Sequence, residues 1–499
     1  MKVTIQHLGA IQQAEIDLKP LTVLIGPNNT GKTWMAYTLG GIFGRRGWSE
    51  YVEAYVEGKL SEKYPTLDSA IETVLKDGSA KIDLVTFAEQ YGEQYFQNVA
   101  SYAPQWMPDF MSTQFAVFDK LKVSIDLMGS KAAFVKCVKQ STVRSSIARG
   151  LFTLSKKRGD PVLYAYTSDE KEDSTSQEEQ ETLLEEIPAE AIKLHLVRNV
   201  TRVLHQALYA NTVMFPTERT GLVTGRLRPH PRADTLSILS ENAQKVVEAL
   251  AQALKQLDLS RADLEEFISS GAKNAIGSVG DFLNTLGKIF NIGSKDLERR
   301  ERSGRANSQI HKYIDLARIL EQKILAGGIS LSTPEPDPQR DILFHPLKNV
   351  KLEIPIASSM VKELSLLVLY LHYLARPDEL LIIDEPEMNL HPEAQVKMIE
   401  FLAMLVNAGL KVLITTHSPY LLDHLSNLIY AAEHKKEEQG SLAEIFFLES
   451  CDAFISQEKV SIYCVDNGTA ENILQDHGQI DWSTFGDITD QIADIHYKL

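Results

Sequence analysis

The sequence predicts an α/β fold in which a mostly parallel sheet, flanked by helices, is assembled from both ends of the chain. Three observations lead to this prediction. An apolar run at 21–25 ends in a glycine-rich turn, another at 380–384 ends in two acidic residues, and a third at 411–415 follows one helix later. Strands that are apolar on both faces are typical of parallel sheets covered by helices on each side.

The long segments between these strands divide the chain. Residues 1–45 and 330–499 are expected to form the core domain, with one further strand around 212–220. Residues 46–210 are expected to be a mostly helical insertion. In 221–329, apolar residues recur three and four positions apart, which favours a helical hairpin or lid.

Composition places the chain among ordinary globular proteins. Its 499 residues are long enough for several domains, and the hydrophobic content of 44% with 24% charged residues is typical of a packed core. The net charge of −16 argues against a protein that coats nucleic acid by bulk charge. Residues 168–186 are almost free of apolar side chains, so we interpret them as a solvated acidic loop.

The number of cysteines and the length of the apolar runs indicate in which cellular compartment the protein works. Three cysteines are too few and too scattered for a disulfide framework or a zinc site. The N-terminus lacks the apolar stretch of a signal peptide, and the longest apolar run, 364–375, is too short to cross a bilayer. We therefore expect a cytoplasmic protein with no membrane contact.

A glycine-rich loop follows the first apolar strand and leads into a helix. Its sequence, Gly-Pro-Asn-Asn-Thr-Gly-Lys-Thr, matches the phosphate-binding loop at each fixed position and in the required strand–loop–helix context. Backbone N–H groups of such a loop turn toward an anion, helped by the positive end of the helix. Lys32 is expected to reach the β- and γ-phosphates of ATP, and Thr33 to take a Mg²⁺ position. The candidate nucleotide-binding residues are Gly26, Asn28, Asn29, Thr30, Gly31, Lys32 and Thr33.

Two adjacent acids, Asp384 and Glu385, stand where the strand 380–384 ends. The carboxyl ends of parallel strands form the edge at which such sheets bind ligands. Capping of the next helix would be an alternative role, but a cap needs neither a preceding apolar strand nor two acids. We expect Asp384 to bind Mg²⁺ through its water shell and Glu385 to act as the general base that polarises the attacking water.

A histidine, His417, follows the next apolar strand. An isolated histidine is usually structural. This one comes one strand–helix–strand unit after the acidic pair, which places it at the same edge of the sheet. We therefore expect it to contact the γ-phosphate or the attacking water.

Together these motifs resemble those of ABC-class ATPases, in particular the prokaryotic AAA branch with SMC-like repair proteins and overcoming-lysogenization-defect (OLD) ATPases of antiphage defence. The segment 381–393 is similar to the Walker B motif and D-loop of that branch, and 415–422 is similar to its H-loop. The resemblance covers roughly 1–40, 212–222 and 350–430. It implies an ABC-type P-loop ATPase head, split here by large helical insertions, that uses ATP and Mg²⁺.

In the family that these motifs resemble, two heads enclose two ATP molecules, and a signature segment of one head contacts the γ-phosphate in the other. Ser358 and Ser359 match this segment and precede a helix, although Met360 stands where the family pattern has glycine. The alternative is that a serine here serves only as a helix N-cap. Asn389, in the D-loop, is a further candidate. The resemblance implies a homo-oligomer, at least a dimer.

The residues from Phe215 to Arg219 resemble a segment near the ATP-bearing core in prokaryotic members of this branch. Arg219 is therefore a candidate functional residue. A structural ion pair is the alternative, and the sequence leaves both open.

Two functions fit these motifs. The first is an ATP-dependent sensor or scaffold of a prokaryotic antiphage system, which controls a separately encoded effector, most simply a nuclease. The second is an SMC-like repair or chromosome-associated ATPase that clamps DNA directly. Basic clusters at 144–158, 219–232 and 299–305 would allow DNA contact, although most charged runs are solvated surfaces. Nuclease activity in this chain itself is not expected.

Overall fold

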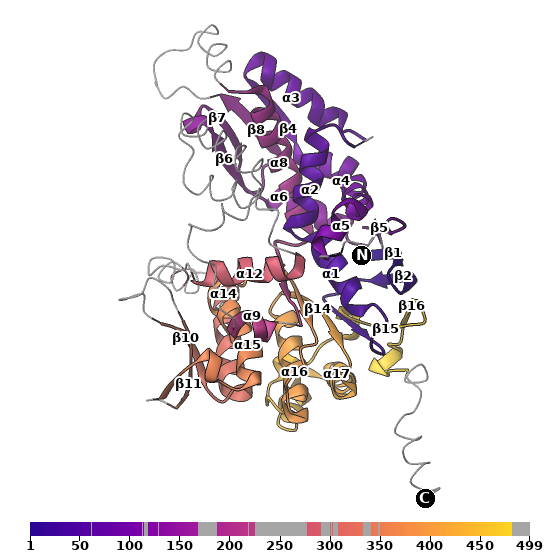
Figure 1. The fold of residues 1–499 in the computed structure, drawn as a ribbon, viewed down its shortest axis with the longest axis vertical. Coiled ribbons are helices and arrows are strands. Elements are labelled where there is room, and N and C mark those ends of the chain that lie inside the picture. The colour runs from indigo at the N-terminus through magenta and orange to yellow at the C-terminus, as the bar shows by residue number, and fades with distance from the viewer. Residues whose placement is uncertain are drawn as a thin grey trace, which may run out of the picture.

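The computed structural model describes residues 1–481 except for several gaps. The gaps are 61, 112, 114–117, 128, 168–186, 218, 225–276, 291–299, 301, 303–307, 333–340 and 348–349. The expected acidic loop 168–186 and much of the expected hairpin 221–329 therefore lie outside the described residues. In Figure 1 the first insertion forms the upper part of the molecule, and the orange and yellow C-terminal elements form the lower part.

A six-stranded sheet forms the centre of the core domain, in the order β16-β15-β3-β14-β13-β9. Five of its strands run parallel to one another: β15, β3, β14, β13 and β9. The sixth, the edge strand β16, pairs antiparallel with β15. The strand bounds are β16 Thr469–Asn472, β15 Val460–Asp466, β3 Leu21–Ile25, β14 Lys411–Thr416, β13 Leu380–Asp384 and β9 Thr212–Phe215. Segments from both ends of the chain thus share one sheet, as the apolar runs predicted.

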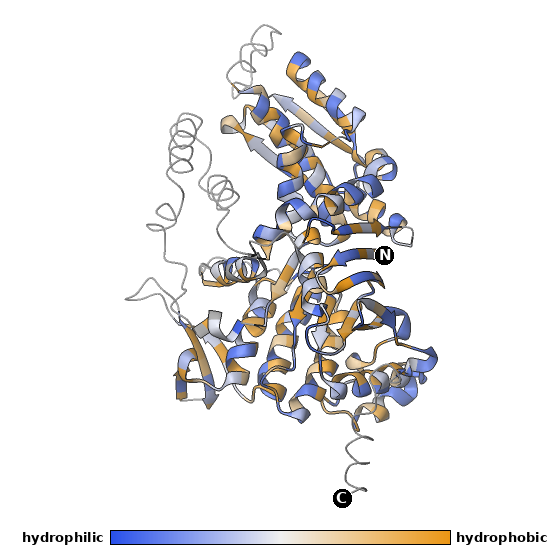
Figure 2. Ribbon diagram, turned by 45° about the vertical axis from the view of Figure 1, so that its right-hand side comes forward, coloured by the Kyte–Doolittle hydropathy of each residue, from blue (hydrophilic) through white to orange (hydrophobic). Residues whose placement is uncertain are grey.

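Side chains of this sheet alternate between two core clusters, because successive residues of a strand point to opposite faces. In β13, Leu380 and Ile382 pack with helix α1, whereas Leu381 and Ile383 pack with helices of the other face. Hydrophobic residues concentrate in these strands and on the inner sides of the helices around them (Figure 2). Helix α1, Lys32–Phe43, covers the first face. The helices of the other face are α12 Gly277–Phe290, α14 Ser308–Ile319, α15 Ser359–Tyr373, α16 Pro392–Asn407 and α17 Pro419–Glu433.

The first insertion contains more strand than its sequence predicted. Its helices are α2 Arg45–Val56, α3 Pro65–Asp77, α4 Leu84–Ser101, α5 Ala103–Phe110, α6 Lys131–Gln140 and α8 Ala189–Leu208. An antiparallel sheet in the order β4-β8-β7-β6 is formed by Ser79–Asp83, Val162–Thr167, Phe152–Lys156 and Val143–Ile147. These strands are short and alternate polar with apolar residues, so they carry a weaker signal than the helices around them.

Two smaller sheets complete the described structure. The N-terminal hairpin of β1 and β2 continues into β5 of the first insertion, and a second antiparallel sheet has the order β10-β11-β12. The bounds are β1 Lys2–Leu8, β2 Ile11–Asp17, β5 Lys122–Asp126, β10 Gly328–Leu331, β11 Ile342–Leu347 and β12 Val350–Glu353. Two short helices remain, α9 Arg219–Thr224 and α18 Lys436–Ala443.

The first insertion is attached to the C-terminal end of helix α1. The side chain of His205 in α8 is buried. Its imidazole Nε2 donates to the carbonyl oxygens of Phe43 at 2.9 Å and Gly44 at 3.2 Å. Its Nδ1 lies 3.0 Å from the hydroxyl of Tyr95. Burial lowers the pKa of His205 to about 4, so the ring is neutral at physiological pH. Two carbonyl groups at the C-terminal end of α1, those of Phe43 and of the C-cap residue Gly44, are satisfied in this way.

Gly47 allows helix α2 to pack against the end of α1. A Cβ atom at this position would lie 2.7 Å from the carbonyl oxygen of Ile42 and 2.8 Å from that of Gly41. Both neighbours are backbone atoms of α1, so the clash cannot be relieved by turning a side chain. The absence of a side chain at residue 47 therefore sets the distance between the two helices.

We predict that Gly47→Ala lowers the free energy of unfolding by about 1–3 kcal/mol, because the added methyl group overpacks this junction. Gly440→Ala in α18 is the matched control, since a Cβ there meets nothing within 4 Å. That variant should gain about 0.5–1 kcal/mol from helix propensity. Denaturant unfolding of both variants measures the difference, and equal stabilities would contradict the close packing at Gly47.

Candidate functional site

The glycine-rich loop joins β3 to α1 at the carboxyl edge of the central sheet. Three of its residues have positive φ: Gly26 at 151°, Asn29 at 64° and Gly31 at 102°. Glycine is required at residue 26, where a Cβ atom would lie 3.1 Å from the backbone carbonyl carbon of Val465 in β15. Thr30 donates its hydroxyl to the carbonyl oxygen of Pro27 at 3.0 Å, which closes the loop.

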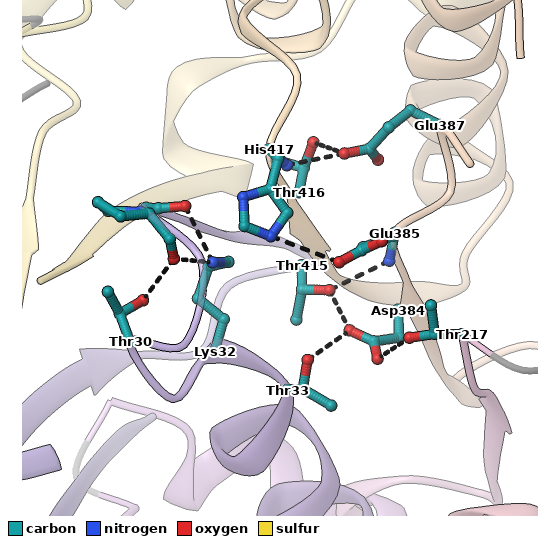
Figure 3. A network of polar contacts seen from close by, with 12 residues as sticks. Thr30, Lys32, Thr33, Thr217, Asp384, Glu385, Glu387, Thr415, Thr416 and His417 are labelled. Atoms are coloured by element: carbon teal, nitrogen blue, oxygen red, sulfur yellow. Dashed lines mark hydrogen bonds and ion pairs between the residues drawn. The ribbon is translucent and has the colours of Figure 1, made fainter. Parts of the chain in front are cut away.

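Lys32 lies inside this loop. Its ammonium group donates to the carbonyl oxygens of Gly26 at 2.9 Å and Pro27 at 2.7 Å, and its side chain is buried (Figure 3). Burial lowers the pKa of Lys32, while the nearby carboxylates of Glu385 and Asp384 oppose that effect. The loop thus holds one cation among backbone groups, which suits an anionic phosphate chain.

Asp384 is fully buried and is held by four hydroxyl groups from three separate segments. Its Oδ1 accepts from Thr33 at 3.1 Å and also from Thr415, and its Oδ2 accepts from Tyr37 at 3.0 Å and also from Thr217. Figure 3 shows Thr33, Thr217 and Thr415 directed at this carboxylate. These hydroxyl groups satisfy both oxygens of the buried carboxylate and fix its orientation.

The oxygen atoms of Asp384 and the neighbouring Thr33 could act as ligands for a magnesium ion. Mg²⁺ prefers oxygen ligands and keeps several of its waters, so one or two protein oxygens beside a phosphate chain are sufficient. Thr33 and Asp384 supply a hydroxyl and a carboxylate within 3.1 Å of each other, at the N-terminal end of α1. When bound, the ion would neutralise phosphate charge; Thr33 would hold it directly and Asp384 through water.

Glu385 faces His417 across the end of the sheet. Glu385 Oε1 lies 3.4 Å from His417 Nε2, and both side chains are partly exposed, at 28% and 31%. The contact with His417 lowers the pKa of Glu385, with smaller contributions from Lys32 and Arg219. Glu385 is therefore a carboxylate at neutral pH and is open to a water molecule, as a general base must be.

Glu387 links the acidic segment to the H-loop. Its Oε1 accepts from the hydroxyl of Thr416 at 2.7 Å and from the backbone N–H of His417 at 2.7 Å (Figure 3). Its Oε2 is buried without a hydrogen-bond partner. Burial raises the pKa of Glu387 above the ordinary value of 4.5. This carboxylate therefore fixes the backbone from which His417 projects.

The two signature serines lie at the start of helix α15, whereas Arg219 lies directly behind the acidic pair. Ser358 is the N-cap of α15, and its hydroxyl accepts from the N–H of Val361 at 3.4 Å, while Ser359 begins the helix; both are exposed. Arg219 is buried behind the acids, where it contacts the backbone of Asp384 and the side chain of Glu363. Asn389 donates to Glu363 at 3.1 Å.

Sequence reasoning did not single out several residues of this site. They are Tyr37, Thr217, Glu363, Thr415, Thr416 and Glu387. Thr415, Thr416 and Glu387 stand inside the segments that carried the H-loop and D-loop resemblance, so their positions were a usable signal. Tyr37 follows the phosphate loop on helix α1, and Glu363 follows the signature serines on α15. Only the tertiary structure shows what these two side chains contact.

The family model for the AAA ATPase domain matches residues 1–422, which is most of the chain. The chain belongs to this family. Among solved structures, it is similar to an Smc head domain with an extended coiled coil, bound to the C-terminal domain of ScpA, from Pyrococcus furiosus. That match has 11% identity and a TM-score of 0.34 and covers 99% of this chain and 98% of the other.

A second similar structure is an Smc head bound to the C-winged helix domain of ScpA, with 9% identity and a TM-score of 0.34, covering 95% of this chain and 96% of the other. No curated protein matches the chain. The family and the parallel sheet together confirm the predicted α/β fold of a P-loop ATPase head. Among the described residues, no helix combines the length and apolar composition needed to cross a bilayer.

We predict a pH-dependent effect of Glu387→Gln. An acid whose pKa is higher in the folded than in the unfolded state stabilises the fold only while protonated, so its contribution falls as pH rises above about 4.5. The unfolding free energy of Glu387→Gln relative to wild type should therefore increase between pH 4.5 and about pH 7. Denaturant unfolding at several pH values measures this difference.

Two further variants make this prediction specific. Glu387→Ala removes the acceptor shared by Thr416 and His417, and should cost about 1–3 kcal/mol. Glu393→Gln is the control, because Glu393 is exposed and Lys397 lowers its pKa. If Glu393→Gln and Glu387→Gln follow the same pH trend, burial is not what raises the pKa of Glu387.

Proposed function

We propose that this protein is a Mg²⁺-dependent ATPase whose heads pair around ATP and control a separately encoded effector, a nuclease, in prokaryotic antiphage defence. One observation carries the proposal: Lys32, Asp384, Glu385 and His417, drawn from distant segments, meet at one edge of the central sheet. A phosphate loop, a buried acid placed to bind a metal ion and a partly exposed second acid are the groups that ATP hydrolysis needs.

Each of these residues takes a defined role in the proposed reaction. Lys32 and the loop N–H groups bind the β- and γ-phosphates, and Thr33 with Asp384 orients them. Glu385 accepts a proton from the water that attacks the γ-phosphorus atom, and the bond to the ADP oxygen breaks. His417, 3.4 Å from Glu385, orients that water and the γ-phosphate. General-base catalysis of this kind contributes about 10²–10⁴-fold in rate.

Pairing of two heads is supported by the exposed start of helix α15. Ser358 and Ser359 present hydroxyls there, and the N-terminal end of a helix of this length attracts phosphate. In the proposed dimer this surface meets the γ-phosphate held by the other copy. ATP then acts as a link between subunits, and its hydrolysis releases them.

Control of an effector is the part of the proposal that rests on the resemblance to OLD-like ATPases of antiphage defence. The insertions, whose sequence lacks the long heptad repeats of the DNA-clamping class, would carry the effector contact. The direct DNA clamp loses part of its support, because two residues of its basic clusters have other contacts. Lys156 is buried and donates to the carbonyl oxygens of Lys139 and Ser141 at 2.9 and 2.8 Å, and Arg219 is buried inside the head.

We predict that Lys32→Ala abolishes ATP binding, whereas Glu385→Gln binds Mg-ATP normally but loses about 10²–10⁴-fold in turnover. Removing the base leaves the phosphate and metal contacts in place. Phosphate release measures turnover, and sedimentation of Glu385→Gln with Mg-ATP measures dimer formation. Near-normal hydrolysis by Glu385→Gln would show that another group is the base.

The same sedimentation assay tests the contact between subunits. Glu385→Gln should form a dimer with Mg-ATP, and the addition of Ser358→Ala and Ser359→Ala should prevent it. Lys32→Ala should remain unpaired. If the serine changes alter neither the oligomeric state nor turnover, the two serines cap the helix and do nothing more.

We predict that the gene, expressed together with its neighbouring open reading frame, protects cells from phage, and that Lys32→Ala and Glu385→Gln abolish this protection. The reason is that nucleotide binding and release would govern the effector. Plaque counts measure protection. A hydrolysis rate that rises several-fold with added duplex DNA at low salt, without phage protection, would favour the DNA clamp instead.

A further inference from the structure

Arg219 is among the largest fully buried side chains of the described structure, although its guanidinium group is charged. One of its terminal nitrogens donates to the carbonyl oxygen of Asp384 at 2.7 Å and to that of Pro216 at 3.0 Å. The other donates to the carbonyl oxygen of Glu385 at 3.0 Å. The arginine thus holds the two peptide groups that flank Glu385, through their carbonyl oxygens.

The backbone held in this way is strained. Glu385 has φ of 51°, in the left-handed region that residues other than glycine rarely adopt. Its N–H group donates to the carbonyl and hydroxyl oxygens of Thr415, each at 3.1 Å. Contacts from Arg219 on one side and from Thr415 on the other therefore hold the conformation that directs the Glu385 carboxylate toward His417. Such strain persists only where the surroundings impose it.

Glu363 holds the arginine in place. Its Oε2 lies 2.5 Å from Arg219 Nε, and the two side chains are 1% and 2% exposed. Its Oε1 accepts from Asn389 at 3.1 Å and from Thr220. Glu363 belongs to α15, the helix that begins at Ser359, and lies one turn after its start. One buried carboxylate thus connects the start of α15, the D-loop and the arginine.

A buried ion pair is by itself weak evidence for stability, because removing two charges from water costs about as much as their attraction returns. The geometry of this pair is specific. A guanidinium group presents several N–H donors in a fixed plane, and Arg219 directs them to three carbonyl oxygens while it forms an ion pair with Glu363. A lysine would keep the charge but could not reproduce that arrangement.

We propose that Arg219 is a positioning residue for ATP hydrolysis: it holds the backbone of Asp384 and Glu385 in the conformation that aims the general base, and Glu363 ties this backbone to helix α15. The inference rests on the proposed hydrolytic role of Glu385. In this proposal the two alternatives that the sequence left open apply together, since Arg219 forms an ion pair with Glu363 and separately holds the backbone of Asp384 and Glu385.

The test compares Arg219→Lys with Arg300→Lys. Arg300 also donates to backbone carbonyl groups, those of His372 at 3.3 Å and Ala375 at 2.8 Å, but at the opposite end of α15. Arg219→Lys should lower kcat at least about tenfold, since small displacements of a catalytic group can cost up to about a hundredfold. Its dissociation constant for a fluorescent ATP analogue should stay within about twofold. Arg300→Lys should lower the thermal midpoint and keep kcat.

Three outcomes would overturn the proposal. They are a wild-type kcat in Arg219→Lys, an equal loss of kcat in Arg300→Lys, and a loss of nucleotide binding that accounts for the loss of turnover. If Arg219→Lys does not fold, Glu363→Gln serves instead, because it keeps an oxygen for Asn389 but weakens the hold on Arg219. That variant should also lose kcat without a change in nucleotide affinity, and unchanged kcat would overturn the proposal. Failure of the wild-type chain to hydrolyse ATP would contradict the proposed function itself.

Discussion

Parallel pairing in the central sheet is the constraint on which the site depends. Strand β14 lies between β3 and β13, and its register places Thr416 opposite Ile25 and Thr415 opposite Asp384. Because these strands end at the same edge, the loop after β3, the acids after β13 and the histidine after β14 meet there. A slip of one residue would turn every side chain of a strand to the other face. The two separate core clusters resist such a slip, since each takes alternate residues.

Three acids within four residues have three different environments. Asp384 is buried among hydroxyl donors, Glu385 is partly exposed beside His417, and Glu387 is buried beneath the backbone of the H-loop. Contact with His417 lowers the pKa of Glu385, whereas burial raises that of Glu387. The same carboxylate chemistry thus serves three positions: a buried one proposed to bind a metal ion, one open to water and one that supports the backbone of the H-loop.

Helix α1 joins the site to the first insertion. Its N-terminal end carries Lys32 and Thr33, and its C-terminal carbonyl groups accept from His205 of α8. Gly47 brings α2 against the same end of α1. The opposite side of the acidic segment is held by Arg219 and Glu363, which connect it to α15. The edge of the sheet that carries the candidate site is therefore connected to the first insertion through α1 and to the signature segment through α15.

The sequence by itself determined the strands, the phosphate loop and the acidic pair. The predicted strands at 21–25 and 380–384 have those bounds in the structure, because short, wholly apolar runs bounded by glycine or acids carry a strong local signal. The antiparallel sheet of the first insertion was not predicted, because its strands are short and their sequence pattern is weaker than that of the helices around them. Tertiary structure alone decided which hydroxyls surround Asp384 and what Arg219 contacts. Thr33 and Asp384 are 351 positions apart, and Arg219 and Glu363 are 144 apart by their numbers, so no local pattern records either pair.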